Sequence, residues 1–171
     1  MSSVFTRLAT PADAAAIATI YNQGIADRIA TFETRMRTAD EVAQWFGNRF
    51  PIVVTVVNDQ IVAFAATFPY RTRACYAGIA EFSVYVEREW RGRGIGRLTM
   101  LALIEAAARA GFWKLLSRVF VENTASRAML ASVGFREVGI YEKHARLDGR
   151  WRDVVIVERL IPEQLTREEE N

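Results

Sequence analysis

The chain has 171 residues, of which 51% are hydrophobic and 25% are charged, and its formal net charge is +2. These values are typical of one globular domain with its own core, and so small a net charge gives little support to nucleic-acid binding. Cys75 is the single cysteine, which excludes an intrachain disulfide and favours a reducing compartment. No apolar run approaches the roughly 18 residues of a membrane span, and Met1–Thr10 lacks the apolar centre of a signal peptide. We therefore expect a soluble, cytoplasmic protein.

The first half of the sequence predicts a strand, two helices and a hairpin. Thr10 is a typical helix N-cap and Pro11 suits the first helical position, so a helix should begin here and run to about Ala26. Val42 and Phe46 recur at helical spacing and mark the apolar face of a second helix. The expected elements are a strand at Phe5–Leu8, helices at Thr10–Ala26 and Ala39–Arg49, and paired strands at Ile52–Val57 and Ile61–Phe68.

The second half is organised around an apolar strand that enters a long apolar helix through a glycine-rich turn. Near the end of the chain, Asp148 and Gly149 form a strong turn signal between two further strands. The expected elements are strands at Ile79–Val86 and Leu115–Phe120, helices at Gly94–Ala110 and Thr124–Val133, and a hairpin of Glu137–Leu147 with Arg152–Leu160. This order predicts an α/β fold with a mixed sheet flanked by helices, in one domain over residues 1–165, followed by a flexible acidic tail at 166–171.

The turn after Ile79–Val86 has the composition of a phosphate-binding loop. Backbone N–H groups at a helix N-terminus have no partner within the helix, so an anion beyond them satisfies these donors. Gly92, Gly94 and Gly96 let the main chain approach such a ligand closely. The stretch lacks the Gly-Lys-[Ser/Thr] of a P-loop and the acidic residue that closes the next strand of a dinucleotide-binding fold. A turn that uses glycine only for its backbone freedom is the alternative interpretation.

Two motifs make this turn more specific. Arg91-Gly92-Arg93-Gly94-Ile95-Gly96 resembles the [Q/R]-x-x-G-x-[G/A] signature of the GNAT superfamily of acetyl-CoA-dependent N-acetyltransferases. Asn123-Thr124-Ala125-Ser126, followed by Val133-Gly134-Phe135, resembles the second block of that superfamily. The resemblance covers nearly the whole chain. It implies the GNAT fold, with a central mixed, mostly antiparallel sheet flanked by helices, and acetyl-CoA as the acetyl donor.

A narrower resemblance concerns the acceptor. Ala80–Val86, the pattern Arg71-x-Arg73-x-x-Tyr76 and Gly149-x-Trp151-x-Asp153-Val154 resemble the phosphinothricin acetyltransferase branch, which includes enzymes acting on methionine sulfoximine and arsinothricin. All three substrates are glutamate-like amino acids, and the sequence does not distinguish them. The branch implies transfer to the α-amino group, resistance by detoxification, and a homodimer. A peptide or protein N-terminal acetyltransferase and a non-catalytic acetyl-CoA sensor are the alternatives.

Acetyl transfer to an amine needs a neutral nucleophile, and a nearby carboxylate can accept the proton directly or through water. Glu81 is the candidate base, because it is an acid within an apolar strand and the branch resemblance supports this role. Burial there would raise the pKa of its carboxyl toward the working range of a base. A salt-bridged strand carboxylate is the alternative. The resemblance also implies a bulge near Val84–Val86 that frees backbone N–H groups, with Val84 stabilising the oxyanion.

The resemblance implies one set of residues for acetyl-CoA and a second set for the amino acid. The cofactor would contact Val84, Tyr85, Val86, Arg91, Gly92, Arg93, Gly94, Ile95, Gly96, Arg97, Asn123 and Ser126. The substrate would contact Phe32, Glu33, Arg71, Arg73, Tyr76 and Glu81. Arginine binds carboxylate, phosphinate or arsonate groups through two parallel hydrogen bonds, which suits Arg71 and Arg73 to these substrates. Plain surface positions for the arginines and a helix N-cap for Asn123 are the alternatives.

One position departs from the family pattern. Many members have a tyrosine, and this branch can have a histidine, seven residues after the motif asparagine, as general acid for the departing thiolate. Leu130 occupies this position here, so Tyr85 or solvent would supply the proton, or the thiolate, with a thiol pKa of about 8.5, would leave without a dedicated acid. His144, the only histidine, is expected to be structural or a dimer contact. No cluster of cysteine, histidine and acidic residues has metal-ligand spacing, so no metal site is expected.

Overall fold

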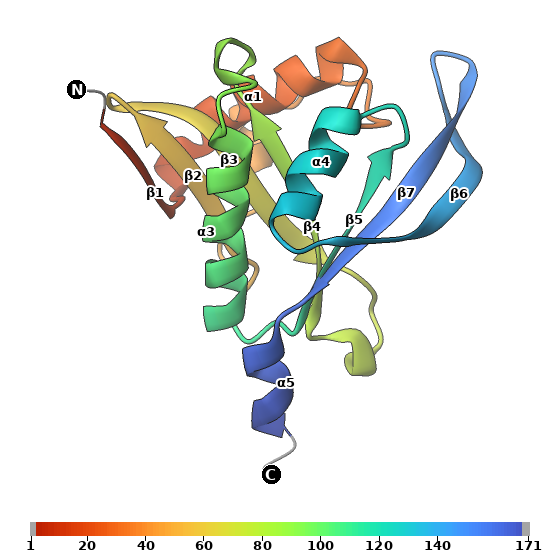
Figure 1. The fold of residues 1–171 in the computed structure, drawn as a ribbon. Coiled ribbons are helices and arrows are strands. Elements are labelled where there is room, and N and C mark those ends of the chain that lie inside the picture. Colours follow the sequence, from red (N-terminus) through yellow and green to blue (C-terminus); the bar gives the residue numbers. More distant parts are fainter. Residues whose placement is uncertain (1–2, 169–171) are drawn as a thin grey trace.

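The computed structural model describes residues 3–168, with side chains described for residues 3–165. Seven strands form one sheet in the order β1-β2-β3-β4-β5-β7-β6, and helices cover both of its faces (Figure 1). The strands are β1 (Val4–Leu8), β2 (Ile52–Val57), β3 (Gln60–Pro69), β4 (Ile79–Val86), β5 (Lys114–Phe120), β6 (Arg136–Leu147) and β7 (Arg150–Leu160). The helices are α1 (Ala14–Asp27), α2 (Ala39–Ala43), α3 (Ile95–Arg109), α4 (Thr124–Ser132) and α5 (Pro162–Glu168).

Two apolar layers hold the helices against the sheet. On one face, Leu103 of α3 and Leu130 of α4 are buried in a cluster with Phe82 of β4. On the other face, Ile17 of α1 is buried in a cluster with Tyr85 of β4. Because successive side chains of a strand point to opposite faces, β4 contributes alternately to both layers. This central strand therefore lies between two apolar cores, which fix its position in the molecule.

The predicted order of elements is confirmed from β1 to β7, whereas α5 was not predicted, and the predicted bounds of the central strand coincide with those of β4. Both predicted hairpins are also present, β2 with β3 and β6 with β7. Their turns, Asn58-Asp59 and Asp148-Gly149, have positive φ at both positions, as a two-residue turn between twisted strands requires. Local turn chemistry therefore fixes the pairing next to each turn, and the register shifts further along both hairpins.

The predicted second helix is wrong in length, because α2 ends at Ala43 and not at Arg49. The side chain of Asn48 holds the following residues in a turn. Its amide donates a hydrogen bond to the Trp45 carbonyl at 3.1 Å, and its oxygen accepts one from the Phe50 N–H at 2.9 Å. Asparagine side chains that bond nearby backbone groups in this way compete with helix formation.

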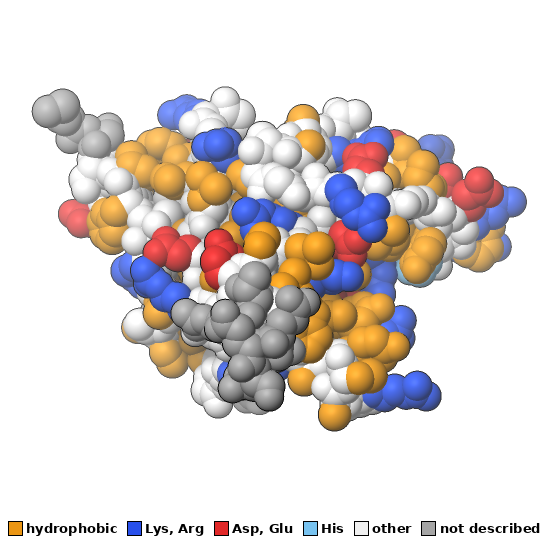
Figure 2. Space-filling view, turned by 60° about the horizontal axis from the view of Figure 1, so that its bottom comes forward, with side chains coloured by type: hydrophobic (Ala, Val, Ile, Leu, Met, Phe, Trp, Pro, Cys, Tyr) orange, Lys and Arg blue, Asp and Glu red, His pale blue; other side chains and the backbone are white. Residues whose placement is uncertain are grey.

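At the C-terminal end, the backbone of residues 166–168 belongs to α5, and residues 169–171 of the predicted acidic tail lie outside the described residues. Over residues 3–168 no helix is long and apolar enough to cross a membrane. Figure 2 shows the face that comes forward when the end with α5 is turned toward the viewer. On this face, positive and negative side chains lie among hydrophobic ones, in keeping with the small net charge.

Asp13 fastens the start of α1 to β1. Its carboxylate accepts hydrogen bonds from Arg7 Nη1 at 2.7 Å, from Arg7 Nη2 at 3.0 Å and from the Thr10 N–H at 2.8 Å. The Arg7 hydrogen bonds, helped by that of Thr10, hold the pKa of Asp13 below its ordinary value although burial opposes them. The folded state therefore binds this proton less readily than the unfolded chain. The resulting stabilisation is present above the ordinary carboxyl pKa of about 3.9 and is lost as pH falls through the folded pKa.

We expect Asp13→Asn to lower the melting temperature by roughly 2–6 °C at pH 7, which corresponds to about 1–2 kcal/mol. The difference from the wild type should shrink below about pH 4, because the unfolded wild-type chain then takes up a proton at Asp13 that the folded state binds less readily. Thermal unfolding at several pH values measures this. Asp40→Asn, which changes an exposed carboxylate of α2, is the control. A difference that stays constant down to pH 3 would contradict the role assigned to Asp13.

Candidate active site

β4 and β5 begin as neighbours and then diverge. They pair in parallel only over Ile79–Glu81, opposite residues 114–116, whereas β4 pairs with β3 from Ala80 to Val86. A side-chain bond follows the last pair, in which Ser117 Oγ donates to the Phe82 carbonyl at 2.9 Å. Beyond this bond, no strand of the described residues pairs with the β5-facing edge of β4. A gap therefore opens in the middle of the sheet.

The open edge presents backbone groups of Val84 and Val86. In an antiparallel pair, the backbone groups of successive residues point alternately toward and away from the partner strand. The Glu87 N–H donates to the Val62 carbonyl of β3 at 2.7 Å, so the N–H groups of Val84 and Val86 point the other way, into the gap. The predicted bulge is wrong, because the register of β4 against β3 is continuous. Divergence of β5 frees these groups instead.

The glycine-rich turn brings the N-terminus of α3 to the same gap. Gly92 and Gly94 have φ values of 73° and 80°, in the left-handed region where a side chain is strained. Gly94 is the N-cap of α3, and its carbonyl accepts the N–H of Leu98 at 3.2 Å. The N–H groups of residues 95–97 precede this first helical bond and point out of the helix end. This geometry suits an anion such as a phosphate.

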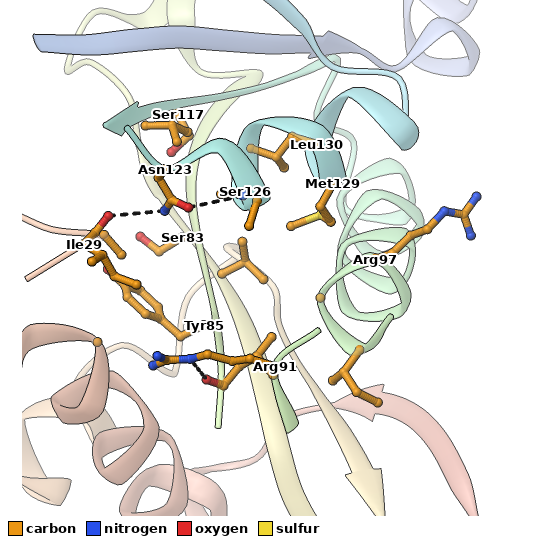
Figure 3. A pocket seen from close by; sticks show the side chains of 18 of the residues that line it. Ile29, Ser83, Tyr85, Arg91, Arg97, Ser117, Asn123, Ser126, Met129 and Leu130 are labelled. Carbon is orange, nitrogen blue, oxygen red and sulfur yellow. Dashed lines mark hydrogen bonds between the residues drawn. The ribbon is translucent and has the colours of Figure 1, made fainter. Parts of the chain in front are cut away.

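A cavity of about 430 Å³ lies between the edge of β4, the N-terminus of α3 and α4 (Figure 3). The predicted cofactor-binding residues line it, with the exception of Arg93, whose guanidinium lies over the Trp90 ring at 4.9 Å from its centroid. Ser83, Ser117 and Arg118 also line the cavity, and sequence reasoning missed Arg118 as a site residue. β4, the glycine-rich turn and the motif that begins at Asn123 therefore line the same cavity.

Arg91 is held against α1. Its Nη1 donates to Asp27 Oδ2 at 2.7 Å. Its Nε donates to the Val86 carbonyl at 3.2 Å, the bond drawn at Arg91 in Figure 3. Arg88 Nη2 binds the other oxygen of the same carboxylate at 2.8 Å. The Arg88 hydrogen bonds, followed by that of Arg91, lower the pKa of Asp27. Arg97, by contrast, extends away from the other labelled residues in Figure 3. Asp27 thus ties the glycine-rich turn to α1.

Asn123 has two roles in the structure. Its side-chain oxygen accepts the Ser126 N–H at 3.2 Å, which makes it the N-cap of α4 and supports the alternative interpretation from the sequence. Its side-chain amide donates to the Ile29 carbonyl at 3.3 Å, as Figure 3 shows. Asn123 therefore connects α4 with the loop after α1, and both segments form walls of the cavity.

The wall at α4 is apolar. Leu130 is 1% exposed and lines the cavity next to Met129, so this helix offers no acid at the position where the family pattern has one. Tyr85 also lines the cavity, but burial raises its pKa above the ordinary tyrosine value. A higher pKa makes Tyr85 a weaker acid, which disfavours it as the proton donor. Solvent is the better candidate of the two.

Glu81 is less buried than expected, because 28% of its side-chain surface is exposed. The prediction of a buried carboxylate is therefore wrong. The alternative of a salt-bridged carboxylate is observed, since Glu81 Oε1 lies 3.4 Å from Nη2 of Arg118. Glu81 is the last β4 residue paired with β5, so it stands at the mouth of the gap. Glu81 does not line the 430 Å³ cavity, whereas Arg118 does.

The predicted substrate-binding residues lie outside that cavity. Arg71 lies three residues beyond Phe68, the β3 partner of Glu81, and its pKa is raised first by Tyr70 and then by the charges of Glu81 and Tyr141. The other four have contacts elsewhere or lie at the surface. Phe32 packs on Phe120 with 4.9 Å between ring centroids, Glu33 pairs with Arg37 at 2.7 Å, Tyr76 packs on Tyr70 at 5.8 Å, and Arg73 is exposed at the start of a 3₁₀ turn. The structure thus brings Arg71 to Glu81 and disperses the rest.

The model of the acetyltransferase (GNAT) family matches residues 18–135 of the chain, a span that contains β4, the glycine-rich turn and Asn123. The chain belongs to this family. This acetyltransferase has a mixed sheet flanked by helices, as its family resemblance implied, with one parallel pair among antiparallel ones. Over residues 3–168 no group of three or more His, Cys, Asp or Glu side chains could hold a metal ion.

Named relatives are similar to the acetyltransferase over most of its length. A phosphinothricin N-acetyltransferase from Streptomyces coelicolor is 31% identical, covering 82% of this chain and 86% of the relative. A methionine sulfoximine/methionine sulfone acetyltransferase from Salmonella typhimurium is 28% identical, covering 89% and 91%.

Solved structures are similar as well. YncA of Salmonella typhimurium, solved with acetyl-CoA, has a TM-score of 0.87 and 27% identity over 92% of this chain and 93% of that one. A ribosomal-protein-alanine N-acetyltransferase from Brucella melitensis has a TM-score of 0.87 and 32% identity, covering 92% and 99%.

We expect Asp27→Asn in this acetyltransferase to raise the KM for acetyl-CoA by about 3- to 10-fold, with kcat changed less than twofold. An amide loses the charge that holds Arg88 and Arg91 and leaves the glycine-rich turn less firmly placed, a loss of about 1 kcal/mol for a partly exposed pair. Steady-state kinetics with acetyl-CoA as the varied substrate measure this. Asp59→Asn, in the β2–β3 turn, is the control. An unchanged KM would show that the turn is held without Asp27.

Proposed function

We propose that this acetyltransferase transfers the acetyl group of acetyl-CoA to the α-amino group of a small glutamate-like amino acid. Phosphinothricin and methionine sulfoximine represent the substrate class. One observation carries the proposal: the open edge of β4 and the N-terminus of α3 share a cavity, and at the mouth of the gap beside it the Glu81 carboxylate lies 3.4 Å from Arg118, with Arg71 three residues beyond the β3 partner of Glu81. The backbone N–H groups suit acetyl-CoA, and the charged side chains around Glu81 suit an amino acid as acceptor.

The donor half of the proposal rests on backbone geometry. The pantetheine arm of acetyl-CoA carries amides, and the unpaired N–H groups of Val84 and Val86 suit it as a neighbouring strand would. The N–H groups of residues 95–97 suit the pyrophosphate. A backbone N–H in this gap, from Val84, also lies where it can stabilise negative charge on the acetyl carbonyl oxygen as the amine attacks. These roles are performed by backbone groups and do not require a charged side chain in the cavity. Arg91, which lines the cavity, is accordingly paired with Asp27.

The acceptor half rests on Glu81. Its partial exposure leaves room for an amine or a water molecule beside the carboxylate, so that it can take the proton released on acetylation. The apolar wall at Leu130 offers the departing thiolate no proton donor. The thiolate can leave unprotonated because its thiol is acidic, and solvent can then supply the proton. The proposal includes four narrower features that the branch resemblance of the sequence implies: arsinothricin as a further acceptor, resistance by detoxification, a cytoplasmic location and a homodimer.

The direct test is release of free thiol from acetyl-CoA in the presence of phosphinothricin, methionine sulfoximine, arsinothricin or ordinary amino acids. We expect saturable turnover of at least one glutamate-like analogue, with N-acetylation of the product confirmed by mass spectrometry. Binding of acetyl-CoA without turnover of any amino acid would overturn the proposal and leave the sensor alternative.

A second candidate is acetylation of a protein N-terminus. The similarity to the ribosomal-protein-alanine N-acetyltransferase favours it, at 32% identity over 92% of this chain. A peptide beginning with alanine, added to the same thiol-release assay, distinguishes the candidates. Arg71 and Arg118 at the mouth favour a small anionic acceptor, because a peptide has no α-carboxylate beside its reacting amine.

A further inference from the structure

Arg118 stands where the gap in the sheet begins. It lies two residues beyond Leu116, the last β5 residue that pairs with β4. Alternation along β5 puts it on the same face as Leu116 and Phe120, which belong to or pack against an apolar cluster that Phe32 also contacts. Arg118 is the charged residue of β5 that both lines the cavity and contacts Glu81. It therefore joins the acetyl-donor side of the site to the candidate base.

The guanidinium of Arg118 has donors to spare. A guanidinium carries five N–H donors, and in the described structure the polar partner of Arg118 is Glu81 alone, through a single long contact of 3.4 Å. Arg91, which also lines the cavity, is more tightly held, because it binds Asp27 at 2.7 Å. Arg97 lines the cavity too, but it extends away from the other labelled residues in Figure 3. With 39% of its side chain exposed, Arg118 can reach a ligand without breaking the fold.

In an α-amino acid, the amine that loses a proton and the carboxylate that carries negative charge are held at a fixed short distance. Its amine and its carboxylate are attached to the same carbon atom. If the amine lies within hydrogen-bond reach of Glu81, about 2.6–3.2 Å, the carboxylate must lie within a few ångströms of Glu81 as well. A cation that binds this carboxylate must therefore be a close neighbour of Glu81. Arg118 meets this condition, and its planar guanidinium matches a carboxylate in two-point geometry.

We propose that Arg118 binds the α-carboxylate of the acceptor amino acid and exchanges its loose contact with Glu81 for this bidentate one. The inference rests on the proposed function and names the residue that selects amino acids over simple amines. The inference assigns each of the two arginines, Arg118 and Arg71, to a different end of the substrate. Arg118 takes the α-carboxylate inside the gap, and Arg71, on the loop before β4, is left for the anionic head of the side chain.

The test compares an amino acid that the wild type acetylates with its α-carboxamide, which keeps the amine but lacks the charge. At saturating acetyl-CoA we expect the wild type to prefer the acid by about 10- to 100-fold in kcat/KM, the worth of a hydrogen bond to a charged group. Arg118→Met should lower kcat/KM for the acid by a similar factor and leave the carboxamide within threefold, so that the preference disappears. Arg118→Lys should restore part of it.

The control is Arg146→Met, which removes an arginine that lies over Trp151 on the terminal hairpin. It should leave the preference intact. Melting temperatures and the KM for acetyl-CoA should be unchanged in the Arg118 variants. If Arg118→Met keeps the preference for the acid, or lowers kcat/KM for both compounds equally, the inference is overturned while the proposed function stands. If the wild type acetylates no amino acid at all, the proposed function fails, and the inference fails with it.

Discussion

We expect Glu81→Gln to lower kcat/KM for the amino-acid acceptor by about 10²- to 10⁴-fold, the usual contribution of a positioned general base. Glutamine has the size of glutamate but cannot take the proton of the attacking amine. The contact with Arg118 is long and partly exposed, so its loss should cost little stability. Thiol-release kinetics over a range of pH measure the effect. The loss should be smaller at high pH, where more of the amine is already neutral.

A matched variant separates chemistry from charge. Glu137→Gln removes a strand carboxylate that also pairs with an arginine, Arg127, but lies on β6. Its kcat/KM should stay within twofold of the wild type. Affinity for acetyl-CoA should be unchanged in Glu81→Gln, because the backbone groups of β4 and α3 remain in place. Wild-type kcat/KM for Glu81→Gln at every pH would remove Glu81 from the mechanism.

The second large effect is expected at the N-terminus of α3. Gly94→Ala should raise the KM for acetyl-CoA about tenfold and lower the melting temperature by roughly 2–8 °C. The cause is backbone conformation, since an added Cβ would meet no atom within 4 Å, whereas φ of 80° is strained for alanine by about 1–2 kcal/mol. A turn that relaxes this strain rotates the N–H groups of residues 95–97 away from the phosphate position.

Gly111→Ala is the matched control, at the other end of α3. Gly111 has φ of 89°, and a Cβ added there would also meet nothing within 4 Å. It should lower the melting temperature as much as Gly94→Ala does and leave the KM for acetyl-CoA unchanged. Equal changes in KM for the two variants would mean that strain in α3 acts through global stability and not through the helix end.

The elements that form the donor side of the site could be predicted from the sequence, because their signals are local. The apolar run of β4, the positive-φ glycines of the turn and the N-cap at Asn123 each act within a few residues. The same local reasoning failed for α2, where one asparagine side chain outweighs an amphipathic pattern that continues to Arg49.

The acceptor side was harder to predict, because it depends on which strands lie side by side and where they part. Glu81 was expected to be buried in an apolar strand, but its neighbour β5 diverges at that residue and leaves the carboxylate partly exposed. Arg118 carries no motif. One signal could have found it: a single arginine between Leu116 and Phe120 interrupts an apolar face of β5. Its significance appears only once β5 is placed next to Glu81.

The short pairing of β4 with β5 also divides the sheet into two halves, β1–β4 and β5–β7. Only the pairing at Ile79–Glu81 joins the backbones of the two halves, here called leaves. Changing the angle between the leaves alters the width of the gap without breaking the ladders within either leaf. Side chains that bridge the leaves, such as Ser117 to the Phe82 carbonyl and Asn123 to the Ile29 carbonyl, set this angle in the free protein. Acetyl-CoA that pairs with β4 would hold the two leaves at one angle. Amide hydrogen exchange in β4 should then slow most when acetyl-CoA binds.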